Sequence, residues 1–235
     1  MIALFADILF PSRCAGCGRP VSSRMNFLCE DCARAVHFLD RSCPVCSGPE
    51  PDNGMCAVCS GRRWYLDSNI TVASYDGIMK KLLHELKFGR VRKLHSFLGD
   101  LACAGLAGRG ISADLITWVP MNPKKQRDRG FNQSELIARV MSKRTGIPCR
   151  SLLSERRGAG KQRELGLRDR FINILGRYEA ASGASLSGQS VLLVDDIFTT
   201  GATINECARQ LRNAGARSVI SLTMARADIK RLEKK

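Results

Sequence analysis

The sequence predicts an α/β protein in which a mainly parallel β-sheet, flanked by helices, follows a small cysteine-rich metal-binding domain. Three observations lead to this prediction. Four Cys-x-x-Cys pairs fall within the 46 residues from Cys14 to Cys59. Strand-like and helix-like segments alternate from about residue 65 onward. Near the C-terminus, an aliphatic strand runs through two aspartates into a threonine- and glycine-rich turn and a helix, in the segment VLLVDDIFTTGAT of residues 191–203.

Length and composition narrow the class of protein. The chain has 235 residues, of which 44% are hydrophobic and 25% charged, so it can bury a core. Its net charge of +15 favours polyanionic partners: nucleic acid, an anionic membrane surface or a phosphorylated small molecule. No run of 18 apolar residues occurs, so we expect no membrane insertion. The apolar residues 1–10 lack the basic start of a secretory signal, and we expect a cytoplasmic protein.

The cysteine pairs predict two structural zinc sites, built from Cys14, Cys17, Cys29, Cys32, Cys43, Cys46, Cys56 and Cys59. A Cys-x-x-Cys turn points two thiolates at one point, and two such turns complete a tetrahedron around zinc. Disulfides are the alternative, which four pairs in series make the weaker one. Sequential pairing of the turns gives two zinc ribbons, and alternating pairing gives a cross-brace. We favour sequential pairing because it closes the shorter loops.

After Cys59 the hydrophobic pattern predicts the elements of the sheet and its helices. Strands are expected at residues 69–75, 114–119, 150–153, 191–194 and 218–224, and helices at 77–88, 92–106, from 132 onward and at 202–214. A basic loop is expected over residues 120–130, and a mobile loop over residues 155–170. These segments divide the chain into a double zinc-ribbon domain (1–63), an α/β domain (64–228) and a charged tail (229–235). We expect zinc removal to unfold residues 14–59 and to leave the α/β domain folded.

The segment of residues 191–203 carries the strongest functional signal. Asp195 and Asp196 follow four aliphatic residues, which puts them at the carboxyl edge of the sheet, where parallel sheets bind ligands. The turn that follows opens a helix, and its N–H groups and hydroxyls form a cradle for a phosphate: Thr199, Thr200, Gly201, Ala202 and Thr203. Because two carboxylates repel a phosphate, they suit sugar hydroxyls or a divalent cation. The alternative is an acidic strand end before an ordinary capped helix.

This segment resembles the phosphoribosyl pyrophosphate (PRPP) binding motif of type I phosphoribosyltransferases. Other motifs resemble the ComF family, whose common patterns are VPLHxxRxxxRGFNQ, YxG, LKF and Q…R..N. The matching stretches here are Trp118–Gln133 (WVPMNPKKQRDRGFNQ), Tyr75–Gly77, Leu86–Phe88, and Gln162 with Arg170 and Asn173. The cysteine array is similar to the double zinc ribbon that precedes this domain in many such proteins. Asn122 stands where the family commonly has a histidine.

The resemblance implies a type I phosphoribosyltransferase-like sheet that binds PRPP with Mg²⁺, with Asp195 and Asp196 as the catalytic acids. It also implies a pyrophosphate-binding loop made of Lys124, Lys125, Arg127, Arg129 and the amide of Gly130. The net charge of +9 over residues 119–170 agrees with an anionic leaving group, although these side chains can equally serve only to solvate a loop. The candidate flexible loop that closes over the ligand contains Gln162, Arg163 and Arg170.

Two hypotheses for the function follow. In the first, the protein is a Mg²⁺-dependent phosphoribosyltransferase with an unidentified acceptor, linked to DNA uptake and natural transformation. In the second, it is a non-catalytic competence factor that binds single-stranded DNA, works with DNA-uptake proteins, and retains the PRPP site as a ligand sensor or a relic. The net charge of +15 suits the second hypothesis, whereas 6% aromatic residues offer few platforms on which bases can stack.

Overall fold

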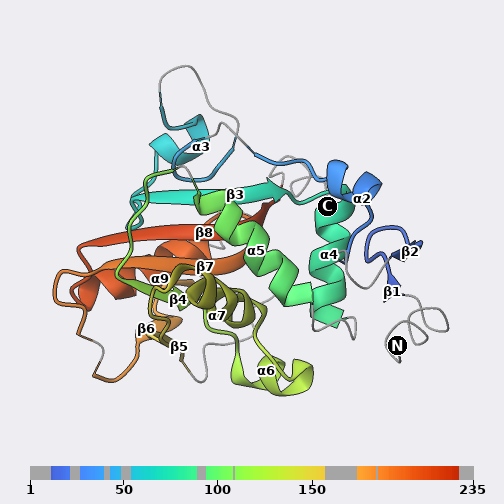
Figure 1. Cartoon of the computed structure of the whole chain (residues 1–235). Coiled ribbons are helices and arrows are strands. Elements are labelled where there is room, and N and C mark those ends of the chain that lie inside the picture. Colours follow the sequence, from blue (N-terminus) through green and yellow to red (C-terminus); the bar gives the residue numbers. More distant parts are fainter. Residues whose placement is uncertain are drawn as a thin grey trace.

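The computed structural model describes residues 12–21, 27–39, 43–48, 54–88, 94–107, 109–156, 174–183 and 185–227. Its centre is a four-stranded parallel sheet in the order β3-β8-β7-β4 (Figure 1). The strands are β3 (Ser68–Ser74), β4 (Leu115–Trp118), β7 (Ser190–Phe198) and β8 (Ser218–Arg226). The predicted α/β class with a parallel sheet is thereby confirmed. A single bridge between Ile116 and Cys149 extends the parallel pairing beyond β4.

Helices cover both faces of this sheet. They are α4 (Gly77–Phe88), α5 (Leu94–Leu106), α7 (Gln133–Thr145) and α9 (Ala202–Asn213). The aliphatic run of β7 alternates between two apolar clusters, because successive side chains of a strand point to opposite faces. Leu192 and Val194 join the cluster under α4, α5 and α7, whereas Val191 and Leu193 join the cluster under α9. The unbroken apolar run is therefore the signature of a strand buried on both faces.

Three local predictions differ from the structure. The basic loop contains a helix, α6 (Pro123–Arg129), which is capped by Asn122 at its start and by Gly130, in the left-handed conformation, at its end. The strand expected at residues 150–153 is shifted to β5 (Leu153–Glu155), which pairs antiparallel with an unpredicted strand, β6 (Tyr178–Ala180). Strand β7 continues through the acid pair to Phe198, because β8 pairs with it along its whole length. Short elements escape periodicity arguments for lack of length.

The cysteine-rich segments form small elements of their own: the hairpin of β1 (Ser12–Arg13) with β2 (Pro20–Val21), and the short helices α2 (Glu30–Arg34) and α3 (Ala57–Ser60). In Figure 1, α3 lies toward one end of β3 and α2 toward the other. Residues between the two cysteine modules run along the edge of β3. The N–H of Leu39 donates to the carbonyl of Val72 (3.1 Å), and the N–H of Ser74 donates to the carbonyl of His37 (2.9 Å).

The cysteine modules share their apolar cores with the α/β domain. Cys14 and Cys32 of the first module belong to the cluster under α4, α5 and α7. Cys43 and Cys59 of the second module belong to the cluster under α9. The main-chain N–H of Asn69 on β3 also donates to the carbonyl of Pro44 (2.7 Å). The modules therefore cover sheet residues that would otherwise face water, while the boundaries at residues 63 and 228 stay predictions.

This shared packing changes what we expect of zinc removal. Chelation should destabilise the sheet together with the modules, because their buried cysteines and aliphatics pack on it. A loss of about 3 kcal/mol would lower the melting temperature of the α/β domain by roughly 6–12 °C. Differential scanning calorimetry of the zinc-loaded and chelated protein measures this shift. A transition of the α/β domain at an unchanged temperature would show that the modules fold apart from it.

Candidate functional site

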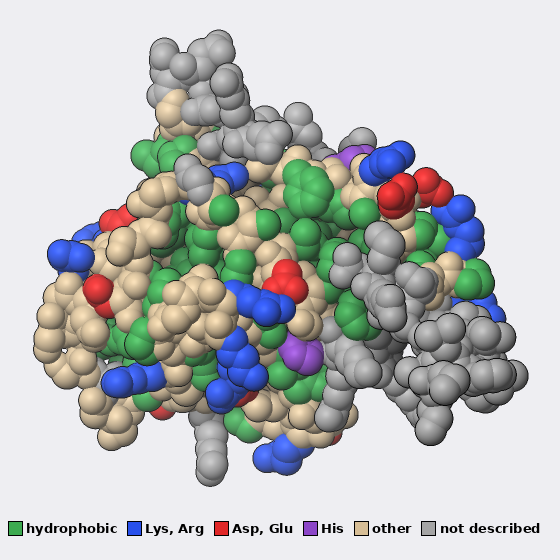
Figure 2. Space-filling view, in the orientation of Figure 1, with side chains coloured by type: hydrophobic (Ala, Val, Ile, Leu, Met, Phe, Trp, Pro, Cys, Tyr) green, Lys and Arg blue, Asp and Glu red, His purple; other side chains and the backbone are tan. Residues whose placement is uncertain are grey.

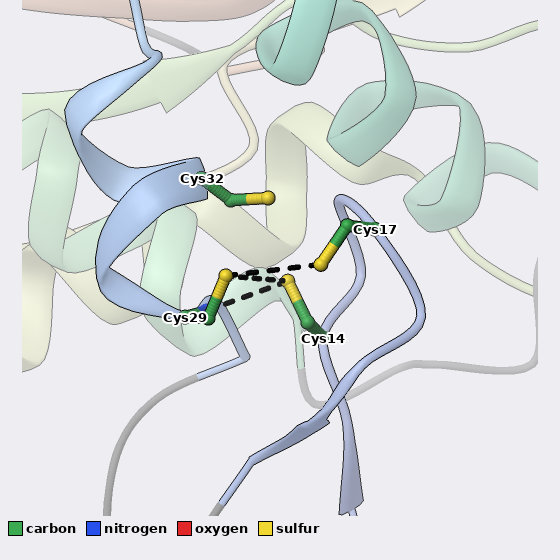
Figure 3. A group of neighbouring side chains, drawn as sticks. All are labelled: Cys14, Cys17, Cys29 and Cys32. Carbon is green, nitrogen blue, oxygen red and sulfur yellow. Dashed lines mark hydrogen bonds between the residues drawn. The ribbon is translucent and has the colours of Figure 1, made fainter.

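The eight cysteines form two groups in the sequential pairing favoured above. Cys14, Cys17, Cys29 and Cys32 make the first group, and Cys43, Cys46, Cys56 and Cys59 the second; within each, the sulfur atoms lie within 4.8 Å of one another. Figure 3 shows the thiols of the first group converging from the β1–β2 hairpin and from the start of α2. Adjacent sulfurs are 3.6–3.8 Å apart. A tetrahedron with Zn–S bonds of about 2.3 Å requires about 3.8 Å.

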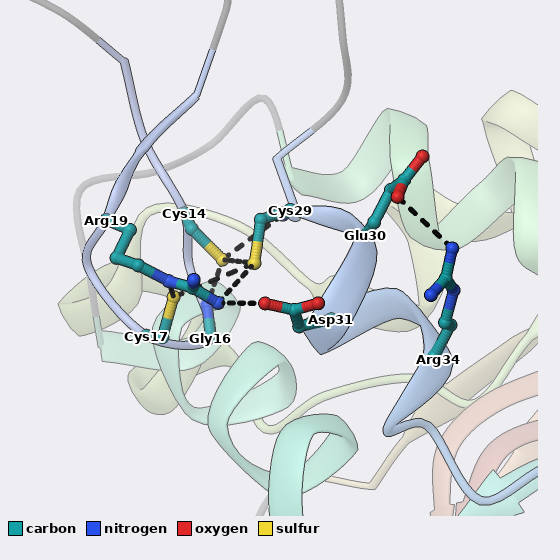
Figure 4. A network of polar contacts seen from close by, with 8 residues as sticks. All are labelled: Cys14, Gly16, Cys17, Arg19, Cys29, Glu30, Asp31 and Arg34. Atoms are coloured by element: carbon teal, nitrogen blue, oxygen red, sulfur yellow. Dashed lines mark hydrogen bonds and ion pairs between the residues drawn. The ribbon is translucent and has the colours of Figure 1, made fainter.

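Hydrogen bonds to the sulfurs of Cys14, Cys17 and Cys46 favour the thiolate form that zinc needs. The N–H groups of Gly16 and Cys29 each donate to Cys14 Sγ at 3.4 Å, and the N–H of Gly48 donates to Cys46 Sγ at 3.3 Å. At the exposed rim of the first group, Arg19 donates to Cys17 Sγ and also pairs with Asp31 (Figure 4). The Arg19 hydrogen bond lowers the pKa of the Cys17 thiol to about 6. Four cysteines at each site leave no open coordination position, so these sites suit a structural metal.

The acid pair is the centre of a second polar cluster, on β7 near the carboxyl edge of the sheet. Asp195 accepts a hydrogen bond from the hydroxyl of Ser134 at the start of α7 (3.0 Å). Asp196 forms an ion pair with Lys87 of α4 at 2.6 Å, and their side chains are only 17% and 20% exposed. Burial, together with the charge of Asp196, raises the pKa of Asp195 to about 7. Three elements that are distant in sequence therefore meet at the acid pair.

A polar cavity of about 280 Å³ opens beside the acid pair. Two residues of the predicted pyrophosphate loop, Lys125 and Arg129, line it, whereas Lys124, Arg127 and Gly130 do not. The reason is the helical form of α6, which puts residues four apart on one face. The remaining lining residues come from the loop after β4, from α4 and α7, and from β5, β6 and β7: Lys87, Val119, Pro120, Met121, Asn122, Asn132, Gln133, Ser134, Glu155, Arg177, Tyr178, Asp195 and Asp196.

An ion pair from the β5–β6 hairpin forms one wall of the cavity, and the sequence did not predict it. Arg177 donates through Nε (2.8 Å) and Nη2 (2.7 Å) to one carboxylate oxygen of Glu155, whose side chain is 3% exposed. Both residues line the cavity. No motif singles out either residue, because they come together only through the pairing of β5 with β6. Gln162, Arg163 and Arg170 of the predicted flexible loop lie outside the described residues.

The threonine- and glycine-rich turn leads from β7 into α9 as predicted. Gly201 precedes the first helical residue with a φ of +79°, and the hydroxyl of Thr200 accepts the N–H of Ala202 at 3.3 Å. The N-terminus of α9 thus opens just after the end of the strand that carries the acid pair. Helix α9 has 12 residues, and its N-terminus offers the dipole and the free N–H groups that bind a phosphate. Thr199 to Thr203 do not line the cavity, so the two parts of the site lie apart.

The segment after the second cysteine module braces this turn. The indole N–H of Trp64 donates to the carbonyl of Cys59 (3.1 Å), and its ring lies beside that of Phe198, with centroids 6.5 Å apart. Asn205 of α9 accepts the N–H of Tyr65 (2.7 Å) and donates to the carbonyl of Arg63 (3.0 Å). The second cysteine module and the start of α9 are therefore joined through one short segment of chain.

Comparison with known proteins agrees with this architecture. The model of the double zinc ribbon domain matches residues 5–60, and that of the phosphoribosyl transferase domain matches residues 133–235. The chain is thus a double zinc ribbon joined to a phosphoribosyltransferase-type domain. Together with the relatives below, these matches confirm the resemblance to ComF-family proteins that the motifs indicated.

Characterised relatives match most of the chain. Competence protein ComFC of Bacillus subtilis is 28% identical over 209 residues, which cover 85% of this chain and 84% of the relative. DNA utilization protein YhgH of Escherichia coli K12 is 28% identical, covering 89% of this chain and 94% of the relative. Competence protein F of Haemophilus influenzae is 25% identical, with 91% and 90% covered. Among the described residues, no helix has the length and apolar character needed to cross a membrane.

Gly201 gives a direct test of the braced turn. A Cβ at this position would contact the ring of Phe198 and would lie 2.9 Å from the ring of Trp64. Gly201→Ala should therefore cost about 1 kcal/mol for the left-handed backbone and roughly 1–3 kcal/mol more for the clash. Gly188→Ala is the matched control, because its φ is +78° with nothing within 4 Å. Urea unfolding of both variants measures the difference, and equal costs would refute the bracing role of the two rings.

The raised pKa of Asp195 predicts a pH-dependent stability. The unfolded chain ionises this carboxyl near pH 4 and the folded protein near pH 7, so the folded state holds the extra proton and loses stability as pH rises between these values. Lys87 and Asp196 are the charged side chains that face the Asp195 carboxyl. Asp195→Asn removes the proton uptake. Its unfolding free energy, relative to wild type, should rise by roughly 1–3 kcal/mol from pH 5 to pH 8.

Urea unfolding at the two pH values makes this comparison in the ligand-free protein. Asp100→Asn serves as the control, because Asp100 is exposed and pairs with Arg144 on the surface. A difference between Asp195→Asn and wild type that is the same at pH 5 and pH 8 would contradict the raised pKa.

Proposed function

We propose that this protein binds PRPP together with Mg²⁺ at the carboxyl edge of its sheet and transfers the phosphoribosyl group to an acceptor. One observation carries the proposal: a single strand, β7, holds the acid pair, and after two intervening residues the phosphate-type turn begins and leads into α9. A ligand with a sugar diol and a terminal phosphate satisfies both features. The match to the phosphoribosyl transferase domain supports the same ligand.

In this proposal each part of PRPP has its own partner. The 5′-phosphate binds the N-terminus of α9 and the hydroxyls of its turn. The ribose hydroxyls bind the carboxylates of Asp195 and Asp196, and the pyrophosphate occupies the polar cavity near Lys125 and Arg129. The acid pair and the ligand itself would hold Mg²⁺ near the pyrophosphate oxygens. When bound, the ion would neutralise negative charge on these oxygens. Closure of the loop with Gln162, Arg163 and Arg170 stays a prediction.

The reaction that these groups support is a displacement at the anomeric carbon. A lone pair of the acceptor forms the new bond to that carbon, the bond to the pyrophosphate oxygen breaks, and its electron pair leaves with the pyrophosphate. Asp195 and Asp196 stabilise the positive charge that develops on the ribose ring, and Lys125 and Arg129 stabilise the negative charge on the leaving group. Lys87 pairs with Asp196 and so holds this side chain in place at the edge of the sheet.

The relatives suggest the cellular setting. Two of them are named competence proteins and one a DNA utilization protein. By this likeness we propose a cytoplasmic protein linked to DNA uptake, where reduced thiolates hold two structural zinc ions. DNA-uptake proteins are its proposed partners.

The second candidate function is binding of single-stranded DNA without turnover, with PRPP as a sensed ligand. The net charge of +15 favours it. On the face that carries α5 and α7, however, Figure 2 shows the basic side chains of the described residues in separate patches, divided by acidic and apolar ones. A backbone-tracking site needs a continuous positive groove. This face offers no such groove among its described residues. The acid pair and the phosphate-type turn on one strand favour a PRPP ligand, and we rank transfer from PRPP first.

Calorimetric titration of PRPP with Mg²⁺ tests the proposal. Wild type should bind in the micromolar range, about −8 kcal/mol, and the double variant Asp195→Asn/Asp196→Asn should lose this binding because the ribose hydroxyls lose their acceptors. Zinc content should stay at two ions in both proteins. Asp100→Asn, on the surface of α5, should bind like wild type.

The outcomes separate the two functions. Pyrophosphate release on addition of candidate acceptors would establish turnover. Undiminished affinity in the double variant would overturn the assignment of the acid pair. If wild type does not bind PRPP, a titration with single-stranded DNA at two salt concentrations decides for the second function, because phosphate contacts give a steep salt dependence.

A further inference from the structure

Gln133 is a buried side chain whose hydrogen-bonding capacity is unused. It is 1% exposed, and its Nε2 is, within the described residues, the buried side-chain nitrogen or oxygen atom without a hydrogen-bond partner. The residue lines the polar cavity beside the acid pair. A buried amide without a partner destabilises a folded protein, because it has given up its bonds to water. Such a group in a native structure calls for a partner that is absent from the bare chain.

The neighbours of Gln133 are, by contrast, fully engaged. Asn132 caps α7 by accepting the N–H of Ser134 (3.0 Å) and donates its own amide to the carbonyl of Val119 (3.0 Å). Ser134 donates its hydroxyl to Asp195. Packing and capping of α7 are thus provided by the residues on either side. The amide of Gln133 is not needed for either purpose.

The charges around the cavity indicate which ligand the amide meets. Four cations line it, and two of them are paired: Lys87 with Asp196, and Arg177 with Glu155. Lys125 and Arg129 form no ion pair with a described residue. Gln133 is also the first residue of α7, a 13-residue helix whose N-terminal dipole favours negative charge. The positive charge of Lys125 and Arg129 and the amide donor all favour an anionic oxygen.

We propose that Gln133 binds a phosphoryl oxygen of a pyrophosphate group held in this cavity. The inference rests on the proposed function, and it gives a role to Gln133, the last residue of the stretch that matches the family pattern, to which the sequence analysis assigned no contact. The amide N–H donates to the oxygen, while Lys125 and Arg129 supply the opposing charge. A trapped water that satisfies the amide is the competing account.

The two accounts predict different changes in two measurable quantities, the melting temperature and the affinity for pyrophosphate. Gln133→Met keeps the volume and removes the hydrogen bond, so the ligand-free protein should melt at the same or a higher temperature, because an unsatisfied polar group is gone. The same variant should bind inorganic pyrophosphate with Mg²⁺ about tenfold more weakly, as expected for one hydrogen bond to a charged group. Gln133→Glu, which puts a carboxylate in the cavity, should weaken binding further.

Gln210→Met is the matched control. Gln210 donates to Glu206 on α9, and it does not line the cavity. This variant should lose some thermal stability and keep the affinity for pyrophosphate. Calorimetric titrations of all variants with pyrophosphate, PRPP and ribose 5-phosphate, each with Mg²⁺, complete the set. Ribose 5-phosphate has no pyrophosphate group, so its affinity should be unchanged in Gln133→Met.

Each outcome decides for or against the proposal. An unchanged pyrophosphate affinity in Gln133→Met, or a melting temperature that falls as in Gln210→Met, overturns it, and so does a wild type that fails to bind pyrophosphate. Pyrophosphate binding that depends on Gln133 in a protein that does not bind PRPP would support this inference and refute the proposed function. PRPP binding that is equal in wild type and Gln133→Met would support the proposed function and refute this inference.

Discussion

The rest of the site depends on one constraint: two carboxylates lie on a strand that is buried on both faces of the sheet. Asp195 and Asp196 are half-buried in β7, just after the aliphatic residues that enter the two apolar clusters, where an unpaired charge is costly. Lys87 forms a largely buried ion pair with Asp196, and Ser134 donates a hydrogen bond to Asp195. These contacts bring the end of α4 and the start of α7 to the carboxyl edge of the sheet. The polar cavity then forms between α6, α7 and the β5–β6 hairpin, beside the acid pair.

The cysteine modules also support this arrangement, through packing on the sheet and through the segment that follows Cys59. Their buried cysteines belong to the same apolar clusters as the sheet. Beyond packing, the segment after Cys59 reaches the phosphate-type turn directly, through the ring of Trp64 and the side-chain amide of Asn205. A tetrahedral metal site is rigid, and a chain that leaves it is well placed to position a nearby loop. The second cysteine module and the turn before α9 are therefore held together by direct contacts.

The chemistry of the site combines opposite charges within a small volume. In the proposed function, the anionic groups bind the sugar hydroxyls, and the cationic groups stabilise the charge of the leaving group. Helix α6 divides the basic loop by geometry: Lys125 and Arg129 face the cavity, and the basic residues between and before them face solvent. Lys125 and Arg129 therefore stay candidates for binding an anion, and Lys124 and Arg127 fit the solvation alternative. The unused amide of Gln133 belongs to the cationic half.

By itself the sequence determined the class of fold, the metal ligands and the acid pair with its turn. Each of these is encoded locally: cysteine spacing, a four-residue aliphatic run, and adjacent residues between a strand and a helix. The sequential pairing of the cysteines also followed from loop length, and the sulfur positions confirm it. The tertiary structure alone decided which basic residues reach the cavity, the Glu155–Arg177 wall, the brace formed by Trp64, and the position of Gln133. The physical reason is that these contacts join residues separated by tens of positions, through short elements such as α6 and β6 that are too brief to leave a periodic pattern.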